Sequence, residues 1–265
     1  MTDPTLYVAA GALVGVLVGL TGVGGGSLMT PILVLAFGQS PAVAVGTDLL
    51  FAALTKITAS FSFGASRRID WRIVRRLALG SLPGAAGVLA TLSLSTRSAL
   101  HADRFLLLCL GVMLVLTAAG MLLERIVRLR LAKSAQPRPL ANPTTTPPLA
   151  LTVLVGFLIG VAVTLTSVGA GALGTVALLW LYPRLPTDRL VGTDIAHAVP
   201  LTLLAGLGHA SLGHINTGML GYLLIGSVPS VLLASRLAIR ISQPRLRLIL
   251  ALMLAVVGTK ILLGK

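Results

Sequence analysis

Two glycine-rich segments contain the residues best suited to bind a ligand. They span residues 21–27 and 166–172, and each one separates two apolar runs. Glycine lets the backbone approach a ligand closely, and a helix that restarts after such a segment has N–H groups without an intrahelical partner. Because a helix N-terminus also carries partial positive charge, each segment predicts an anion-binding site at a broken helix.

The predicted substrate-binding residues are the glycines of the two segments and the hydroxyl groups in or near them: Thr21, Gly22, Gly24, Gly25, Gly26, Ser27, Thr47, Thr166, Ser167, Gly169, Gly171 and Thr193. The alternative is that the glycines only allow helices to pack closely. Packing alone does not require three consecutive glycines, so a binding site is favoured. No Gly-Lys-Ser/Thr follows either segment, which excludes a Walker A nucleotide loop.

Ionisable residues inside apolar runs form a second candidate group, for proton coupling or gating: Asp48, Lys56, Asp194 and His197. Asp48 and Asp194 lie roughly 10 to 12 Å into their predicted helices at 1.5 Å per residue. Charges at such depth are costly and usually mark ion paths or proton relays. The alternative is a structural role, in which backbone N–H groups of the broken helices bind the carboxylates.

The remaining ionisable residues have alternative interpretations. His197 follows Asp194 by three residues, so an Asp–His contact is possible, and a hydrogen-bonded core histidine is the alternative. Lys56 lies about 22 Å into its helix, where snorkelling of its ammonium to the lipid head groups is favoured over a role in the transport path. His209 and His214 lack a third ligand at a recognisable spacing, so neither a metal nor a cofactor is predicted.

The elements that must position these residues are apolar runs of membrane-spanning length. Of the 265 residues, 55% are hydrophobic and 11% are charged, whereas soluble domains carry about 25% charged residues. Crossing a hydrocarbon core of about 30 Å takes about 20 residues. Six ordinary runs reach this length: 41–64, 73–95, 104–123, 188–210, 217–237 and 244–263. The chain is therefore predicted to be an all-α polytopic membrane protein.

An internal repeat divides the chain into two halves. Residues 20–26 read LTGVGGG and residues 165–171 read LTSVGAG, and three later motifs match in the same order: 46–48 with 192–194, 69–70 with 215–216, and 80–83 with 226–229. The predicted first repeat is 1–123, with a broken helix at 6–37. The second repeat is 149–265, with a broken helix at 149–182. A basic, proline-rich linker, 124–148, joins them.

The distribution of basic residues predicts how the halves are oriented. The net charge is +14, from 21 Lys and Arg against 7 Asp and Glu, and the basic residues cluster at 67–76, 125–138, 184–189 and 236–247. All four clusters lie on the cytoplasmic side only if each glycine-broken segment enters and returns as a hairpin. The two repeats are then inverted, as in many secondary transporters. This bias, with contact to anionic lipids, is favoured over nucleic-acid binding.

Taken together, these motifs resemble the TauE/SafE sulfite-exporter family of bacterial membrane permeases. The resemblance covers nearly the whole chain and is carried by residues 15–31, 44–47 and 80–84 and by their repeats in the second half. It implies a permease for small sulfur-containing anions such as sulfite or organosulfonates, often export-directed, in the bacterial inner membrane. The chain departs from the family at Asp48, where many members have Ser or another small residue, and at residues 169–171, which are not three glycines.

The sequence therefore predicts a secondary transporter that holds a small sulfur anion between two inverted repeats, with protons as the candidate coupling ion. A passive anion channel and a non-transporting assembly factor are the alternatives. An enzyme is disfavoured, because the chain has no His-Glu-x-x-His helix, no Gly-x-Ser-x-Gly elbow and no recognisable Cys–His pair. The exact substrate, the direction of transport and the oligomeric state are not predicted.

Overall fold

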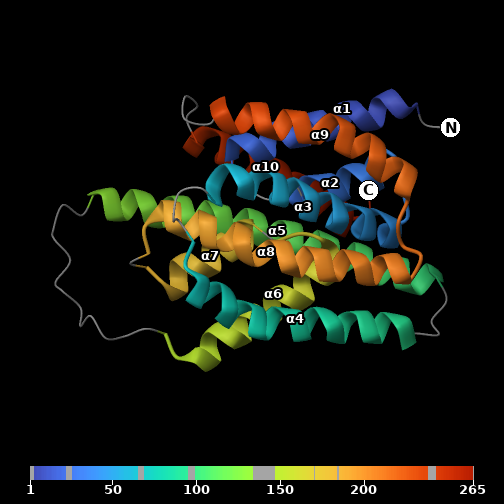
Figure 1. The fold of residues 1–265 in the computed structure, drawn as a ribbon. Coiled ribbons are helices and arrows are strands. Elements are labelled where there is room, and N and C mark those ends of the chain that lie inside the picture. Colours follow the sequence, from blue (N-terminus) through green and yellow to red (C-terminus); the bar gives the residue numbers. More distant parts are fainter. Residues whose placement is uncertain are drawn as a thin grey trace.

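The structure is a computed structural model of the 265-residue chain. It describes residues 3–21, 26–64, 69–94, 99–133, 147–169, 171–183, 185–237 and 243–264. The described residues form ten helices and no strand (Figure 1): α1 Pro4–Thr21, α2 Gly26–Leu35, α3 Pro41–Gly64, α4 Trp71–Leu94, α5 Ala99–Lys133, α6 Leu149–Thr166, α7 Ala172–Leu181, α8 Thr187–Ser211, α9 Thr217–Leu237 and α10 Gln243–Leu262. The predicted all-α class is confirmed.

Six of these helices are long and apolar enough to cross a membrane, namely α3, α4, α5, α6, α8 and α9. The number agrees with the predicted six ordinary spans, but α6 takes the place of α10. Helix α10 has three basic residues, Arg245, Arg247 and Lys260, within its 20 residues. Arg245 and Arg247 lie near its start and Lys260 near its end, so more than two charged residues fall within this helix.

Helix α5 is the largest departure from the predicted boundaries. It ends at Lys133, whereas the apolar run was predicted to end at residue 123. The first ten residues of the predicted linker, 124–133, are therefore helical. This stretch is rich in Glu, Arg, Leu, Ala and Lys, which have high intrinsic helix propensity, so the helix continues beyond its apolar part.

Helices from the two halves of the chain pack against each other in pairs. Helix α1 packs along α9, and α4 packs along α6, so that each broken helix lies against a helix from the other half. Glycines bring the backbones into contact: a Cβ atom at Gly11 would meet the carbonyl oxygen of Leu223, and one at Gly80 would meet that of Val153. Small residues at four-residue spacing allow this close approach in membrane helices.

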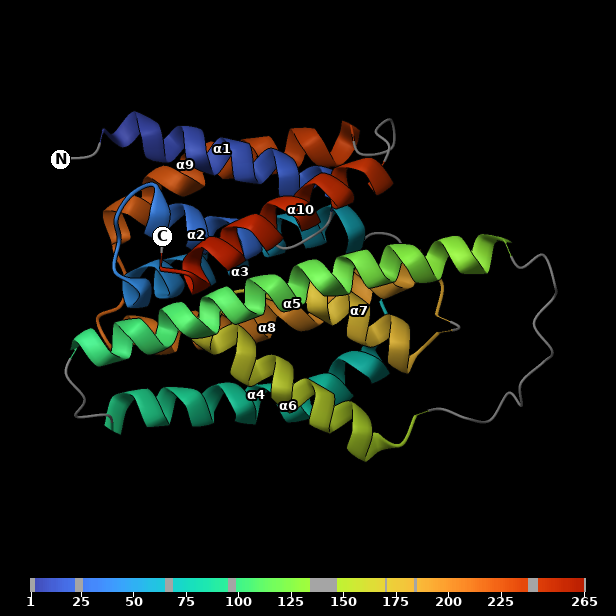
Figure 2. The ribbon, with the colours of Figure 1, turned by 180° about the vertical axis from the view of Figure 1, so that it is seen from behind.

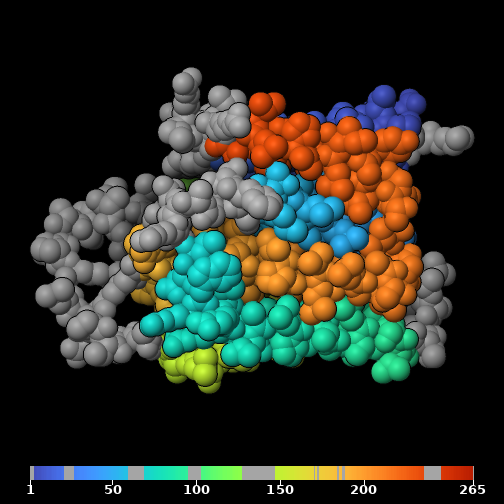
Figure 3. Space-filling view, viewed as in Figure 1, coloured from blue at the N-terminus to red at the C-terminus, as the bar shows by residue number. Residues whose placement is uncertain are grey.

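Helices α3 and α8 form the centre of the molecule. Of their spanning segments, 67% and 61% of the residues are buried, against 33–39% for the other four spans, which leaves the outer helices to face lipid. In Figure 3, α9, α3, α8 and α4 follow one another across one face. The two aspartates predicted for coupling lie on these two central helices.

The short helices α2 and α7 each lead back toward the end of the molecule at which the preceding helix begins (Figure 2). The connection from α2 to α3 lies at the same end of the molecule as the N-terminus, and the connection after α7 lies at the same end as the start of α6. The starts of α4, α8 and α10 and the end of α5, which border the predicted basic clusters, all lie at one end.

Candidate functional site

The break between α6 and α7 has the backbone expected of a glycine-dependent site. Helix α6 ends at Ser167, which is left-handed with φ 58° and donates its N–H to the Val163 carbonyl. Gly169 and Gly171 have backbone φ values of 105° and 146°, which residues other than glycine rarely adopt. Helix α7 then begins without a side-chain cap, and its Gly174 N–H donates to the Gly169 carbonyl at 3.2 Å. Within the described chain, this leaves the N–H groups of Ala172 and Leu173 for a ligand.

The predicted hydroxyl groups at this break differ in their availability. The Thr166 hydroxyl donates to the Ala162 carbonyl at 2.7 Å and accepts the Val168 N–H at 3.2 Å, so it is occupied within the break. Ser167 Oγ is fully buried and has no hydrogen-bond partner in the described part of the chain. Ser167, rather than Thr166, is therefore the hydroxyl of this break that remains available to a ligand.

The break of the first half lies mostly outside the described residues. Gly22, Gly24 and Gly25 fall in the undescribed stretch, while Thr21 ends α1 and Gly26 begins α2. Ser27, the second residue of α2, is buried. The described part of the candidate site is therefore the second break and the helices around it.

Each of the two buried aspartates is bound by a threonine from the preceding short helix. Thr30 of α2 donates its N–H to Asp48 Oδ2 at 3.0 Å and also donates its hydroxyl to that oxygen. Thr175 of α7 donates its hydroxyl to Asp194 Oδ2 at 3.1 Å. Sequence reasoning missed these threonines, although both occupy the same position in the aligned repeats.

Asp48 also faces the break of the other half. The Ser167 side chain lies against the Asp48 carboxylate, but Ser167 Oγ and Asp48 Oδ1 do not reach hydrogen-bonding geometry. Both residues are fully buried, and within the described chain both of these atoms lack a partner. Buried polar atoms without partners are rare in native proteins, so this place marks a site that is incomplete without a further group.

Lys56 lies inside the protein rather than at the head groups. Its side chain is 2% exposed, and it interacts electrostatically with both Asp194 and Asp48. The snorkelling interpretation is therefore wrong. The physical reason is that α3 is the most buried span, so a long side chain from it has no path to the surface and pairs with the acids of α3 and α8.

His197 packs as a core histidine. Its Nε2 lies 2.8 Å from the Ser81 hydroxyl of α4, and its side chain is 2% exposed. Among the described residues, no hydrogen bond or ion pair joins it to Asp194. The possible Asp–His contact is therefore not formed, although the two residues are three positions apart on α8, and the core-histidine alternative agrees with the structure.

Thr47 and Thr193 join the two halves. Thr47 accepts the backbone N–H of Asn216 at 3.2 Å, and Thr193 accepts that of Asp70 at 3.0 Å. Asp70 and Asn216 also cap α4 and α9, since their side chains accept the N–H groups of Ile73 and Met219. Each predicted substrate-binding threonine thus has a structural partner at a helix start of the other half.

We expect Thr193→Val to destabilise the protein without misfolding it. The valine keeps the shape of threonine but leaves the half-buried Asp70 N–H without this acceptor, at a cost of about 1 kcal/mol. A fall in apparent melting temperature of about 2 to 4 °C should follow. Thr202→Val is the control, because its hydroxyl donates only within α8. Equal melting temperatures of Thr193→Val and the unaltered protein would mean that the Thr193–Asp70 hydrogen bond does not stabilise the fold.

His209 and His214 contact each other at the C-terminal end of α8. His209 Nε2 lies 3.0 Å from the Thr164 carbonyl, so this nitrogen is the donor, and His209 Nδ1 is left to accept from His214 Nδ1 at 3.3 Å. Partial burial lowers the pKa of His214, which lies outside the spans. In the described part of the chain, no three His, Cys, Asp or Glu side chains gather into a metal site.

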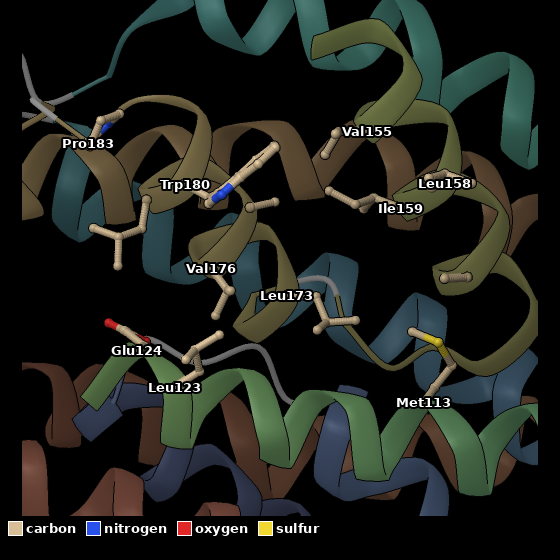
Figure 4. Close-up of a pocket in the computed structure, with 13 residues that line it drawn as sticks. Met113, Leu123, Glu124, Val155, Leu158, Ile159, Leu173, Val176, Trp180 and Pro183 are labelled. Atoms are coloured by element: carbon tan, nitrogen blue, oxygen red, sulfur yellow. The ribbon is translucent and has the colours of Figure 1, made fainter. Parts of the chain in front are cut away.

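A hollow of about 820 Å³ lies between α5, α6 and α7 (Figure 4). Leu173, Val176 and Trp180 of α7 line it, and Glu124 is its charged residue. Glu124 accepts a hydrogen bond from Arg247 at 3.0 Å and forms an ion pair with it. The lining is mostly apolar and its charged residue is an acid, so the N-terminus of α7 is the better anion site.

Comparisons with known proteins agree with this architecture. The family model described as "Sulfite exporter TauE/SafE" matches residues 7–261. The "Probable membrane transporter protein YjnA" of Bacillus subtilis (strain 168) is 38% identical over 257 residues, which cover 95% of this chain and 97% of the relative. A "Probable membrane transporter protein" of Xylella fastidiosa (strain Temecula1 / ATCC 700964) is 26% identical over 92% of this chain and 89% of its own length. No solved structure matches the chain.

Proposed function

The chain belongs to the TauE/SafE family of membrane transporters, and from this premise we propose that it exports small sulfur-containing anions, such as sulfite or organosulfonates, across a bacterial inner membrane. The observation that carries the proposal is the glycine-dependent break before α7. The positive φ values of Gly169 and Gly171 shape the backbone at the start of α7, where the helix has no side-chain cap. Irregular backbone at membrane depth is tolerated only where it is buried or lines a cavity.

The proposal includes two inverted repeats that move relative to each other. Figure 2 supports it, because α1 begins at the end of the molecule opposite to that where α6 begins. The packed pairs α1–α9 and α4–α6 also correspond to each other, because the sequence repeat aligns α1 with α6 and α9 with α4. Transporters of this plan bind substrate near the midplane between the repeats and expose it alternately to the two sides.

The proposed roles of the polar residues follow from their availability. The first free N–H groups of α7 bind the anion, and by the sequence repeat the glycines of the first break, with Thr21 and Ser27, form the equivalent half of the site. Asp48, Asp194 and Lys56 serve proton coupling or gating. A buried lysine between two acids supports this role, because unpaired charges are costly within a membrane.

The direct test is thermal unfolding of the purified protein with sulfite, sulfate, thiosulfate, an alkyl sulfonate, acetate or sodium. A ligand that binds only the folded state at about 100 times its Kd stabilises it by about 2.7 kcal/mol. We expect sulfite or a sulfonate to raise the melting temperature and acetate and sodium to leave it unchanged. A shift with sodium alone, or none with any sulfur anion, would contradict the proposed substrate class.

Flux measurements separate a transporter from a passive channel. In proteoliposomes that receive radioactive sulfite from the external medium, we expect a pH gradient to drive its accumulation above the external concentration. A channel only equilibrates sulfite across the membrane. Flux that never exceeds equilibrium under any ion gradient would therefore favour the channel.

A further inference from the structure

The unpartnered oxygens of Asp48 and Ser167 form a second site, distinct from the N–H groups of α7. Asp48 Oδ2 already accepts two hydrogen bonds from Thr30, whereas Asp48 Oδ1 accepts none within the described residues. Ser167 Oγ lies against this carboxylate and is unpartnered in the same way. Both side chains are fully buried, so bulk water does not satisfy either atom.

The chemistry of these two oxygens selects their occupant. An ionised carboxylate repels an anion, so the substrate itself does not fit here. One proton on Asp48 Oδ1 turns that oxygen into a donor, and Ser167 Oγ is an acceptor placed next to it. A single proton therefore satisfies both atoms, and a larger ligand is not needed.

We propose that Asp48 is the carboxyl group that carries the coupling proton, and that Ser167 of the opposite half is its hydrogen-bond acceptor. This inference rests on the proposed function as a coupled transporter. The proton is taken from water on one side, adds to Asp48 Oδ1 to give a neutral carboxylic acid, and is released to water on the other side. No bond other than this O–H bond forms or breaks.

The position of the pair explains how proton binding would be coupled to movement. Asp48 is on α3 in the first half, and Ser167 ends α6 in the second half. When the halves move apart, Ser167 leaves the carboxyl group and water reaches Asp48 Oδ1. Burial costs the ionised carboxylate more solvation than the neutral acid, so neutral Asp48 favours the closed arrangement and ionised Asp48 favours the open one, in which water solvates Oδ1.

Asp194 is assigned the different role of a fixed counter-ion. Its Oδ2 accepts from Thr175, and its Oδ1 lies directly over the Cα of Gly174. Within the described chain, neither oxygen is among the buried atoms without a partner. It interacts electrostatically with the basic residues Lys56 and Arg247 and with the acid Glu124, so its charged neighbours include two cations.

The ionisable groups around Asp48 agree with this division. Helices α2 and α6 carry no ionisable side chain. On α3 itself, Lys56 acts on Asp48, and no other charged group does so among the described residues. From α8, Asp194 acts on Lys56 rather than on Asp48, and His209 is bound to the Thr164 carbonyl. Burial, the hydrogen bonds from Thr30 and the charge of Lys56 thus act together on Asp48.

Infrared difference spectroscopy of the purified protein tests the assignment without a substrate. We expect a pH titration to reveal the C=O band of one protonated buried carboxyl group, which Asp48→Asn abolishes and Asp194→Asn retains. Ser167→Ala should keep the band but shift it to higher frequency, because the hydrogen bond is lost. If Asp48→Asn fails to fold, the Ser167→Ala shift alone decides, and an unshifted band overturns the proposal.

Three other outcomes would also overturn it. They are a band that survives in a folded Asp48→Asn protein, a band that is lost in Asp194→Asn, and a band that sodium removes at constant pH, which would indicate a metal-cation site. Transport is a separate readout, with sulfite as the probe in proteoliposomes that contain a pH dye. Normal infrared results without sulfite flux would contradict the proposed substrate alone, and proton-independent sulfite flux would contradict the coupling role alone.

Discussion

Gly80→Val is expected to remove nearly all folded protein, whereas Gly87→Val on the same helix leaves the yield unchanged. A Cβ at Gly80 would meet the backbone oxygen of Val153 and, at 2.7 Å, the backbone nitrogen of Phe157. Backbone atoms of a packed helix do not move aside as a flexible side chain does. Overpacking costs about 3 kcal/mol or more at such a site, which is more than about a hundredfold in the folded fraction.

The comparison is read by size-exclusion chromatography of the tagged, detergent-solubilised protein. Gly87 is a matched control, because it lies on α4 and nothing is within 4 Å of its added Cβ. Both variants replace glycine by valine within the same helix, so the change in helix propensity is the same and a difference between them reports the α4–α6 contact. Equal yields would mean that the two helices do not pack as closely as the structure shows.

The second large effect concerns the anion site. Gly171→Ala is expected to abolish stabilisation by sulfite and sulfite transport while the protein still folds. At φ 146° an alanine is strained by about 1 to 3 kcal/mol, and the break relaxes by turning the first N–H groups of α7 away from the ligand. The measurement is the shift in melting temperature with sulfite, followed by sulfite flux in proteoliposomes.

Gly38→Ala controls for backbone strain alone. Gly38 has φ 63° in the turn between α2 and α3, and nothing lies within 4 Å of its added Cβ. It should lose a little stability and keep its response to sulfite. A normal sulfite response in a folded Gly171→Ala protein would remove the break before α7 from the substrate site.

Helix boundaries were the most predictable feature of the fold. The observed α3, Pro41–Gly64, and α9, Thr217–Leu237, coincide with the predicted apolar runs. The break before Ala172 was also predictable, because glycines at 169 and 171 rarely sit together inside a helix. The end of α5 was not, since hydropathy ends at the membrane boundary while helix propensity continues to Lys133.

The candidate site was predicted by residue type but not by partner. The two buried aspartates were found because charges are rare in apolar runs. Their partners Thr30 and Thr175 were missed, because threonine is common in apolar runs and does not by itself indicate a polar site. The aligned repeats hold a signal that would have found them, because both threonines lie at the same distance after the glycine segment.

The sequence by itself determined which segments enter the membrane, where two of them break and which charges lie deep inside. These properties depend on composition and order along the chain. Only the tertiary structure decided that Lys56 is buried, that His197 binds Ser81 and that Ser167 faces Asp48. The physical reason is that lipid is as apolar as a protein core, so hydropathy shows how deep a residue lies but not whether its face meets lipid or another helix.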